Sequence, residues 1–282
     1  MPLFKRHFGP SEQVFLSKQL VDLTLGLGHV KTMSKRWLAA LPVYNEAGYV
    51  DQVLNEVLKY ASNVLAVNDG SIDGTGELLD ERTDIAVVHH DKNRGYGAAL
   101  RTAFQYAIDE GYEFLVTLDC DGQHQPQRIP RFVSACQNAD IVSGSRYLKT
   151  YDGDSVPPAQ RLFINKQVTK TINDLFHWKL TDTFCGFKAY RTSSLKQFNI
   201  TVDGYAMPLE LWAQAAMLEM KILEVPVPLI YLDEKRSFGG ALDDGGVRLK
   251  YYNQVIAESV QAMLARGFSL PKAATNGRVE CP

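Results

Sequence analysis

The sequence predicts an α/β domain with a mainly parallel sheet flanked by helices. Between residues 36 and 145, apolar runs of strand length alternate with amphipathic segments of helix length. Such alternation is typical of βαβ units, whose strands run parallel. Polar segments follow four of the runs, namely PVYNE, NDGSIDGT, NRGYGAA and DCDGQH. Because ligands bind beyond the carboxyl ends of the strands in such sheets, these four segments are expected to share one rim.

In this region each strand is an apolar run that leads toward a helical segment. The first run, WLAALP, is expected to end at Pro42. The expected strands are 37–42, 64–67, 85–90 and 114–119, and the expected helices are 48–60, 75–82 and 97–109.

The alternation weakens after residue 145. The segment GFKAYR is read as a strand, and the two prolines of KILEVPVPLIY suit an edge strand or an extended segment. The glycine-rich RSFGGALDDGG is expected to be mobile. Helical rhythm is present at 158–178, 206–219 and 246–266.

The 282 residues are interpreted as a single main domain with two extensions. Apolar residues recur at helical spacing over 14–27, which is typical of a packing helix or a dimer helix, so a homo-oligomer stays an alternative. The expected division is an N-terminal extension at 1–35, a domain at 36–270 with a nucleotide-binding half at about 36–145 and an acceptor half at about 146–270, and a flexible tail at 271–282.

Composition excludes several classes of protein. The net charge of −2 lacks the basic footprint of a nucleic-acid binder. The four cysteines form no C-x-x-C pair, which argues against a disulfide framework or a zinc site and favours a reducing cytosol. No secretory signal and no transmembrane helix are expected, since no apolar run of about 18 residues occurs. We expect a cytoplasmic protein, with peripheral binding at the inner membrane face as an alternative.

The segment DCDGQH predicts a divalent-metal site. Asp119 and Asp121 are two residues apart directly after an apolar run, so both carboxylates can reach one ion. Mg²⁺ and Mn²⁺ prefer oxygen ligands and keep phosphate oxygens in their shell, and such an ion neutralises a departing diphosphate. Gln123 and His124 are further candidates for metal or phosphate contacts. An ordinary Asx-turn would also place aspartate here, but the other polar segments on the rim favour the metal.

Two other segments are candidates for binding a nucleoside. Asp69 follows the run VLAV, where its carboxylate could accept from a base or a ribose hydroxyl. Tyr44 and Glu46, just after Pro42, could stack on and bond to the nucleoside. Glu46 could instead be a charge favoured by the dipole at a helix start. Asp73 is expected to cap the next helix.

The segment NRGYGAALRTAF is rich in glycine and precedes a helix, like a phosphate cradle. It lacks the Lys-Ser/Thr pair of a P-loop and does not match G-x-G-x-x-G. We interpret Arg94 and Gly95 as residues that bind the donor, with Gly95 and Gly97 allowing close approach of the backbone near it.

In this order, PVYNE, NDGSIDGT, NRGYGAALRTAF, DCDGQH, GSRY and DTFCGFKAYR resemble the family-two glycosyltransferases. The resemblance covers about residues 36–240 and is greatest to the dolichyl- or polyprenyl-phosphate mannosyl- and glucosyltransferase branch. It implies a GT-A (Rossmann-like) fold with a smaller acceptor-side region. It also implies inverting transfer of a hexose from a UDP- or GDP-sugar, such as UDP-glucose or GDP-mannose, with Mg²⁺ or Mn²⁺.

The resemblance also implies roles for individual residues. Asp182 and Glu210 would lie near the sugar or the acceptor, and with Asp121 they are the candidate catalytic residues. If the acceptor is a hydroxyl, Asp182 or Glu210 would take its proton. Arg146 would face an acceptor phosphate, and Arg236 would close over the donor diphosphate. The nucleoside contacts would be Pro42, Tyr44, Glu46 and Asp69, and the metal ligands Asp119, Asp121 and Gln123.

One departure from the branch concerns the acceptor. The branch often has Ser-Lys-Leu where Gly240-Ala241-Leu242 stands here, so one expected phosphate-binding lysine is missing. Residues 146–196 nevertheless contain nine basic and four acidic residues. The helix at 158–178 could therefore lie on an anionic membrane, or be a basic face whose apolar side packs on the core. A polyprenyl phosphate and a soluble saccharide acceptor both stay open.

Two other classes of function fit the sequence less well. A nucleotidyltransferase that forms nucleotide-sugars would need a glycine-rich basic loop after the first strand, and PVYNEAG offers none. A non-catalytic module that binds a nucleotide-sugar would not need both Asp119 and Asp121. The sequence therefore favours an enzyme.

Overall fold

The structure, a computed structural model, describes residues 36–232, 240–272 and 279–280. All of these belong to one compact unit that spans Lys35–Pro282. The expected helix at 14–27, Arg236 and most of the expected flexible tail lie outside the described residues.

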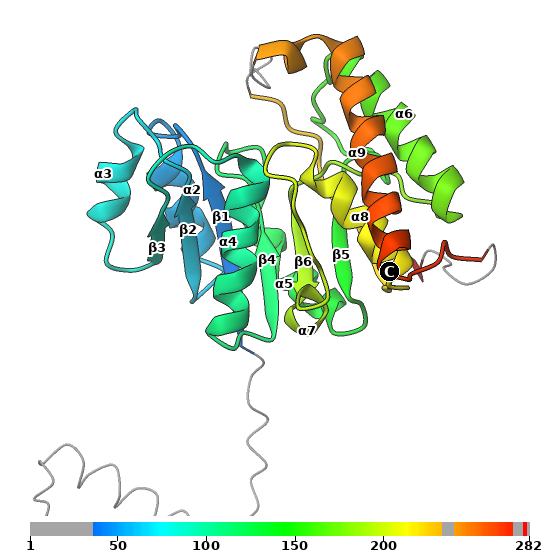
Figure 1. The fold of residues 1–282 in the computed structure, drawn as a ribbon. Helices are drawn as coiled ribbons and strands as arrows, with labels where there is room; N and C mark the ends of the chain where they lie inside the picture. Colours follow the sequence, from blue (N-terminus) through cyan, green and yellow to red (C-terminus); the bar gives the residue numbers. More distant parts are fainter. Residues whose placement is uncertain (1–35, 233–239, 273–278, 281–282) are drawn as a thin grey trace, which may run out of the picture. The chain divides into compact units, whose positions relative to one another are not determined.

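One sheet forms the centre of this unit, in the order β3-β2-β1-β4-β6-β5-β7-β8 (Figure 1). The pairings of β6 with β4 and β5 are antiparallel, and the other pairings are parallel. The predicted mainly parallel sheet is therefore confirmed. The strands are β1 (Trp37–Val43), β2 (Val64–Asn68), β3 (Ala86–His89), β4 (Phe114–Thr117), β5 (Ile141–Ser145), β6 (Lys188–Arg191), β7 (Ile222–Pro226) and β8 (Val279–Glu280).

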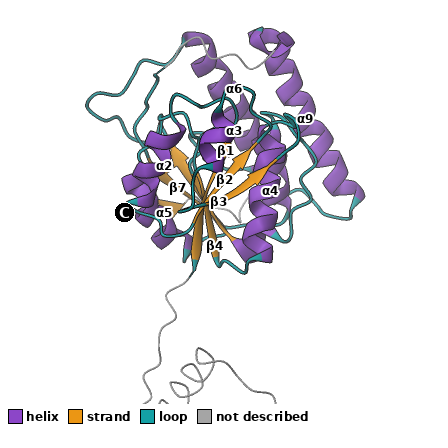
Figure 2. Cartoon of the chain, turned by 90° about the vertical axis from the view of Figure 1, so that its left-hand side faces the viewer, coloured by secondary structure: helices purple, strands orange, loops and turns teal. Residues whose placement is uncertain are grey.

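Helices cover both faces of the sheet, with α2 and α5 on one side and α4 on the other (Figure 2). All six expected helices within the described residues are present, and α5 and α7 are additional. Pro130 in the first turn of α5 is a usual signal of a helix start, so the sequence does contain an indication of this helix. The helices are α2 (Val50–Leu58), α3 (Thr75–Asp80), α4 (Tyr96–Asp109), α5 (Ile129–Cys136), α6 (Ala159–Phe176), α7 (Thr192–Leu195), α8 (Met207–Met217) and α9 (Gly245–Ala265), with 3₁₀ turns η1 (Pro126–Arg128) and η2 (Gly240–Asp243).

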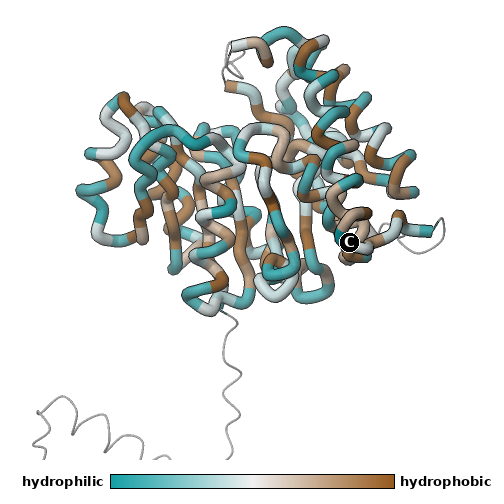
Figure 3. The backbone as a smooth tube through the Cα atoms, in the orientation of Figure 1, coloured by the Kyte–Doolittle hydropathy of each residue, from teal (hydrophilic) through white to brown (hydrophobic). Residues whose placement is uncertain are grey.

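Alternate residues of the strands fill two separate cores. In β1, Leu38 and Ala40 are buried with residues of α4, α8 and α9, whereas Ala39 and Leu41 are buried with residues of α2 and α5. This period of two follows from the pleat of a strand that is covered on both faces. The strands are accordingly mostly hydrophobic along their length (Figure 3).

Three details differ from the expectations. β1 continues through Pro42 to Val43. Proline has no N–H to donate, but the backbone of Pro42 faces β4, and the pairing of β1 with β4 has already ended at Ala40↔Thr117. β7 is not an edge strand, since Leu223 and Glu224 pair with β8 inside the expected flexible tail. Part of the segment expected to be mobile forms η2 and the start of α9.

The apolar side of α6 packs on the core. Ile164, Val168, Ile172 and Phe176 are buried, whereas Phe163 is 55% exposed. Of the two alternatives for this helix, a basic face whose apolar side packs on the core therefore describes most of its length. Among the described helices, none is long and apolar enough to cross a bilayer.

Candidate functional site

A cavity of about 860 Å³ lies beyond the carboxyl ends of β1, β2 and β4 and extends to α6 and α9. It brings together segments that are far apart in the sequence. Of the described residues predicted for the site, three do not line it, namely Arg94, Asp182 and Glu210. The predicted residues that do line it are Pro42, Tyr44, Glu46, Asp69, Gly95, Asp119, Asp121, Gln123 and Arg146.

The Asp119 carboxylate follows β4 and is held by side chains from other parts of the rim. The Tyr96 hydroxyl donates to Asp119 Oδ1 at 3.0 Å, and His124 Nε2 lies 3.2 Å from Oδ2. A side chain at Gly186 would place its Cβ 2.3 Å from Oδ2, so the carboxylate needs glycine there. Because β6 runs antiparallel to β4, its N-terminal end brings Gly186 to this rim.

The Asp121 carboxylate is held within its own turn. The backbone N–H of Gln123 donates to Oδ1 and the Gln123 side-chain amide to Oδ2, each at 3.0 Å. The amide nitrogen of Gln123 thus faces Asp121, so only its oxygen could serve as the expected metal ligand. No group of three or more His, Cys, Asp or Glu gathers as a metal cluster among the described residues. Two carboxylates do fit Mg²⁺ or Mn²⁺ when substrate phosphates complete the shell.

Asp69 is buried at the end of β2 and accepts three hydrogen bonds. The backbone N–H groups of Arg94 and Gly95 donate to it at 3.0 and 2.7 Å. His90 Nδ1 lies 2.6 Å from Oδ1, and Thr102 Oγ1 lies 2.9 Å from the other ring nitrogen of His90. The carboxylate is therefore oriented before any ligand binds. Arg94 contributes its backbone to this arrangement.

The loop after β1, which carries Tyr44 and Glu46, is hydrogen-bonded to the loop after β2. Asn45 N–H donates to Ser71 Oγ, Ile72 N–H donates to Asn45 Oδ1, and Glu46 N–H donates to Thr75 Oγ1, each at 2.9 Å. These bonds fix the loop after β1 against the loop after β2. Tyr44 and Glu46 are thereby held at the cavity.

Asp73 bonds to the first turn of α3 but is not its N-cap. That position is Gly74, with φ of 92°, and Asp73 Oδ1 accepts from Thr75 N–H at 3.1 Å. Asp73 Oδ2 also accepts from Ala47 N–H at 3.1 Å. Although partial burial raises the pKa of Asp73, the bonds from Thr75 and Ala47 outweigh it and hold the pKa below its usual value.

The glycines of NRGYGAA serve a contact within the protein. A Cβ at Gly95 would lie 2.4 Å from Asp203 O, and one at Gly97 would lie 2.3 Å from Val202 O. Ala98 N–H donates to Asp203 O at 3.1 Å. These glycines therefore admit the 202–204 backbone against the start of α4, and Gly95 also lines the cavity; their approach to the donor stays a prediction.

Glu210 holds the same segment from the other side. Its carboxylate accepts from the backbone N–H groups of Thr201 and Val202 at 2.9 and 2.8 Å, and from the Thr201 hydroxyl at 2.9 Å. The side chain is 5% exposed and lies off the cavity lining. It orients a loop, so the structure gives no support to a role as general base.

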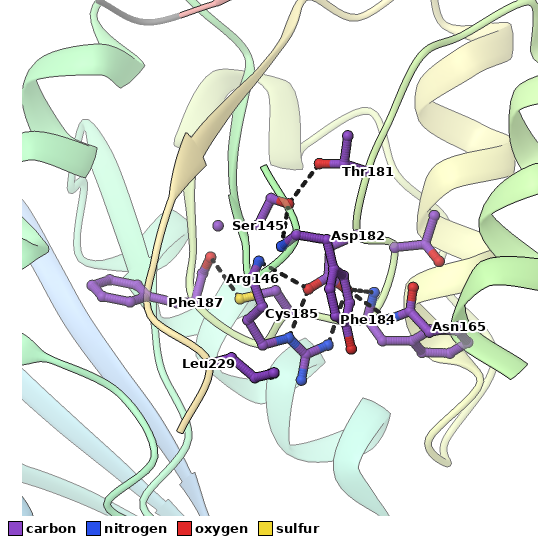
Figure 4. Close-up of polar contacts among 12 residues, drawn as sticks. Ser145, Arg146, Asn165, Thr181, Asp182, Phe184, Cys185, Phe187 and Leu229 are labelled. Atoms are coloured by element: carbon purple, nitrogen blue, oxygen red, sulfur yellow. Dashed lines mark hydrogen bonds and ion pairs between the residues drawn. The ribbon is translucent and has the colours of Figure 1, made fainter. Parts of the chain in front are cut away.

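Arg146, at the end of β5, forms a two-point ion pair with the fully buried Asp182 (Figure 4). Arg146 Nε donates to Asp182 Oδ2 at 2.6 Å, and its second terminal nitrogen donates to Oδ1 at 2.9 Å. Asn165 of α6 donates to Asp182 Oδ1 at 2.9 Å, and Phe184 N–H does so at 3.1 Å.

These contacts determine the charge state of Asp182. Burial raises its pKa, but the Arg146 guanidinium and the hydrogen bonds from Arg146 and Asn165 outweigh burial and hold the pKa below its usual value. Asp182 lies beneath Arg146, orients it and does not line the cavity, so these contacts favour a positioning role over the predicted catalytic one.

The acceptor side of the cavity contains two arginines that were not predicted for the site. Arg161 of α6 lies over the Tyr231 ring at 5.8 Å, and Arg248 of α9 is 3% exposed. Arg248 donates to Leu242 O at 2.7 Å and to the Gln160 side chain at 3.3 Å. These residues belong to no common motif; Arg161 lies in the basic region 146–196, and no sequence signal pointed to Arg248.

The basic residues of 146–196 do not form one exposed face. Lys188 is buried in β6, where its ammonium group contacts Cys185 O and lies 5.5 Å from the Trp212 ring centre. Arg191 donates to the backbone carbonyls at the end of α5, and Lys170 pairs with Asp174 on the surface. The basic residues are thus divided between positions engaged within the protein and exposed lysines, namely Lys149, Lys166, Lys179 and Lys196.

Comparisons with known proteins agree with the resemblance of the motifs. The sequence profile of Glycosyl transferase family 2 matches residues 39–198. An undecaprenyl-phosphate mannosyltransferase of Micrococcus luteus is 31% identical over 226 residues, which are 76% of this chain and 92% of the relative. A polyprenol monophosphomannose synthase of Mycolicibacterium smegmatis is 32% identical over 207 residues, which are 69% of this chain and 77% of the relative.

A solved structure shares the architecture. The mannosyltransferase PcManGT from Pyrobaculum calidifontis, in complex with GDP-Man and Mn²⁺, matches with a TM-score of 0.50 at 17% identity, over 92% of this chain and 82% of that chain. This likeness concerns the fold alone, and it confirms the predicted α/β architecture of GT-A type.

Proposed function

This chain belongs to glycosyl transferase family 2, and we propose that it transfers a hexosyl group from a nucleoside-diphosphate sugar to a polyprenyl phosphate. The predicted enzyme class, a hexosyltransferase, is confirmed by the same comparisons. One observation carries the choice of acceptor: among the described residues that line the cavity, every carboxylate follows β1, β2 or β4, whereas the guanidinium groups that line it come from the end of β5, α6 and α9.

The wall of the cavity that contains Glu46, Asp69, Asp119 and Asp121 suits the donor, and we call it the donor wall. Asp69 is pre-oriented at the end of β2 to accept from a base or ribose, and Tyr44 stands beside it with 39% of its surface exposed. Asp119 and Asp121 would hold Mg²⁺ or Mn²⁺. When bound, the metal supplies positive charge to the diphosphate as it leaves.

The wall that contains Arg146, Arg161 and Arg248 suits an acceptor that is already an anion, and we call it the acceptor wall. Arg146 is oriented by Asp182 through Nε and one terminal nitrogen, so its other terminal nitrogen would be the one that donates to a phosphate oxygen. Arg161 and Arg248 line the same cavity. A phosphate oxygen is a nucleophile without a general base, and this agrees with the engagement of Asp182 and Glu210 in holding other groups.

A saccharide acceptor is the second candidate, and it requires a carboxylate near the attacking hydroxyl. Of the described carboxylates that line the cavity, Glu46, Asp69, Asp119 and Asp121, none comes from the acceptor half. Among the described residues, three arginines and no carboxylate line the acceptor half of the cavity, and this favours an anionic lipid phosphate over a neutral saccharide.

The proposal is tested by binding and transfer with the whole chain. Binding of UDP-glucose and GDP-mannose is measured by calorimetry with and without Mn²⁺, and transfer is then assayed to undecaprenyl phosphate and to free saccharides. We expect metal-dependent binding of one donor and transfer to the lipid phosphate. Absence of donor binding in the presence of metal contradicts the enzyme assignment, and transfer to a saccharide alone contradicts the acceptor.

A further inference from the structure

Tyr96 is the first residue of α4, and it contacts the donor wall from outside the DCDGQH segment. Its hydroxyl donates to Asp119 Oδ1 at 3.0 Å, and its ring stacks on Tyr205 with 5.8 Å between centres and 19° between planes. Both tyrosines line the cavity. A carboxylate oxygen can only accept, so the tyrosine hydroxyl is the donor in this contact.

The backbone of Tyr96 is fixed by its neighbours. Gly95 and Gly97 on either side admit the 202–204 segment, and Ala98 N–H donates to Asp203 O. That segment leads directly to Tyr205, so the ring of Tyr96 and its stacking partner are anchored together. The direction of the hydroxyl is therefore set by packing before a donor binds.

Asp119 and Asp121 differ in what orients them. Both oxygens of Asp121 accept from Gln123, two residues away in the same turn. Asp119 has one contact within its own segment, His124 Nε2 at 3.2 Å from Oδ2, and its other oxygen accepts from Tyr96, which comes from another element of the rim. Groups that bond to a metal ligand from outside the shell determine the direction in which the ligand presents its lone pairs.

We propose that Tyr96 is a positioning residue that directs the Asp119 carboxylate toward the metal and the diphosphate. This inference rests on the proposed function, since it presumes that Asp119 holds a metal with a nucleotide. It adds a residue of the NRGYGAA segment to the metal site. The segment thus contributes a side chain to the donor wall through Asp119.

Replacing Tyr96 by phenylalanine removes the hydroxyl and keeps the stacked ring. We expect Mn²⁺ to bind on the order of tenfold more weakly to Tyr96→Phe, as is usual when a partner of a metal ligand is lost. The affinity is measured by titrating Mn²⁺ in the presence of UDP or GDP and following the paramagnetic resonance signal of the free ion. The Mn²⁺ concentration for half-maximal transfer should rise by the same factor, with the melting temperature unchanged.

Tyr106→Phe is the matched control, since it removes a hydroxyl from the same helix at a residue outside the cavity lining. It should bind Mn²⁺ like the parent chain. Equal Mn²⁺ affinity of Tyr96→Phe and the parent chain overturns the positioning role and leaves the proposed function intact. Failure of the parent chain itself to bind Mn²⁺ with either nucleotide overturns the proposed function instead.

Discussion

The donor wall of the cavity presents carboxylates at the ends of three parallel strands, whereas the acceptor wall presents guanidinium groups from one strand end and two helices. A negative wall holds a diphosphate only with a cation between them, while a positive wall holds a phosphate directly. In our proposal, the cavity therefore binds the donor diphosphate through a metal ion and the acceptor phosphate directly through arginines. Removal of a metal should therefore affect donor binding and leave acceptor binding unchanged.

The two walls are also stabilised in different ways. On the donor wall, Asp69 and Asp121 accept from backbone N–H groups nearby. On the acceptor wall, the charge of Arg146 is balanced by Asp182, which is completely buried. A buried ion pair is costly to break, so changes on this side should affect folding as well as activity.

The largest expected effect comes from the donor wall. Asp121→Ala removes one of the two proposed metal ligands, and the charge stabilisation supplied by a metal is worth several kcal/mol in a transition state. We expect the metal-dependent transfer rate to fall by roughly 10³-fold, which corresponds to about 4 kcal/mol. The measurement is kcat at saturating Mn²⁺ and donor. Turnover that keeps its metal dependence and its rate removes Asp121 from the site.

On the acceptor wall, Asp182→Asn should destabilise the fold by about 3 kcal/mol at pH 7, since Arg146 loses its buried counter-ion. The pKa of Asp182 is lowered on folding, so its ionised form contributes stability above the ordinary value of 3.8. That contribution is lost as the pH falls through the lower pKa of the folded state. The difference between the parent chain and the variant should therefore shrink only below pH 3.8.

Chemical denaturation from pH 7 to pH 3 measures this difference. The control is Asp174→Asn, because Asp174 pairs with Lys170 on the surface and both side chains are more than half exposed. That variant should lose less than about 0.5 kcal/mol. Equal losses of unfolding free energy in the two variants would contradict a larger contribution from the buried ion pair than from the surface pair.

Arg161→Gln tests the acceptor role of the second wall. The change removes one guanidinium from the cavity, and a hydrogen bond to a charged group contributes about 1.5 kcal/mol. We expect the KM for the polyprenyl phosphate to rise about tenfold, with the donor KM unchanged. Lys166→Gln, an exposed change on the same helix, is the control and should leave both values unaltered. A rise in the donor KM alone would assign Arg161 to the donor.

The donor wall could be predicted from the sequence more completely than the acceptor wall. The alternation of strands and helices and the four polar segments follow from local patterns, and their meeting at one rim follows from the rules of parallel sheets. Asp119, Asp121 and Asp69 could therefore be predicted to lie together. The antiparallel insertion of β6 could not, because nothing in GFKAYR indicates its direction.

The acceptor wall was harder to predict because its residues meet only through tertiary packing. Arg161 and Arg248 are 87 residues apart on helices whose partners no local pattern reveals. Catalytic roles were predicted for Asp182 and Glu210 because the family resemblance places them near the sugar or the acceptor, where a carboxylate can take a proton. Their hydrogen bonds to Arg146 and Val202 instead make them supports, and this depends on contacts that spacing does not encode.

The smallest expected effect distinguishes a backbone contact from a side-chain contact on the donor wall. Arg94 donates through its backbone N–H to Asp69, while its side chain is exposed and lies off the cavity lining. Arg94→Ala keeps that hydrogen bond, so donor KM and kcat should change by less than about twofold, as for most surface substitutions. Steady-state kinetics at saturating Mn²⁺ provide the measurement. A donor KM raised tenfold would instead place the Arg94 guanidinium on the diphosphate, and the donor wall would then contain a cation of its own.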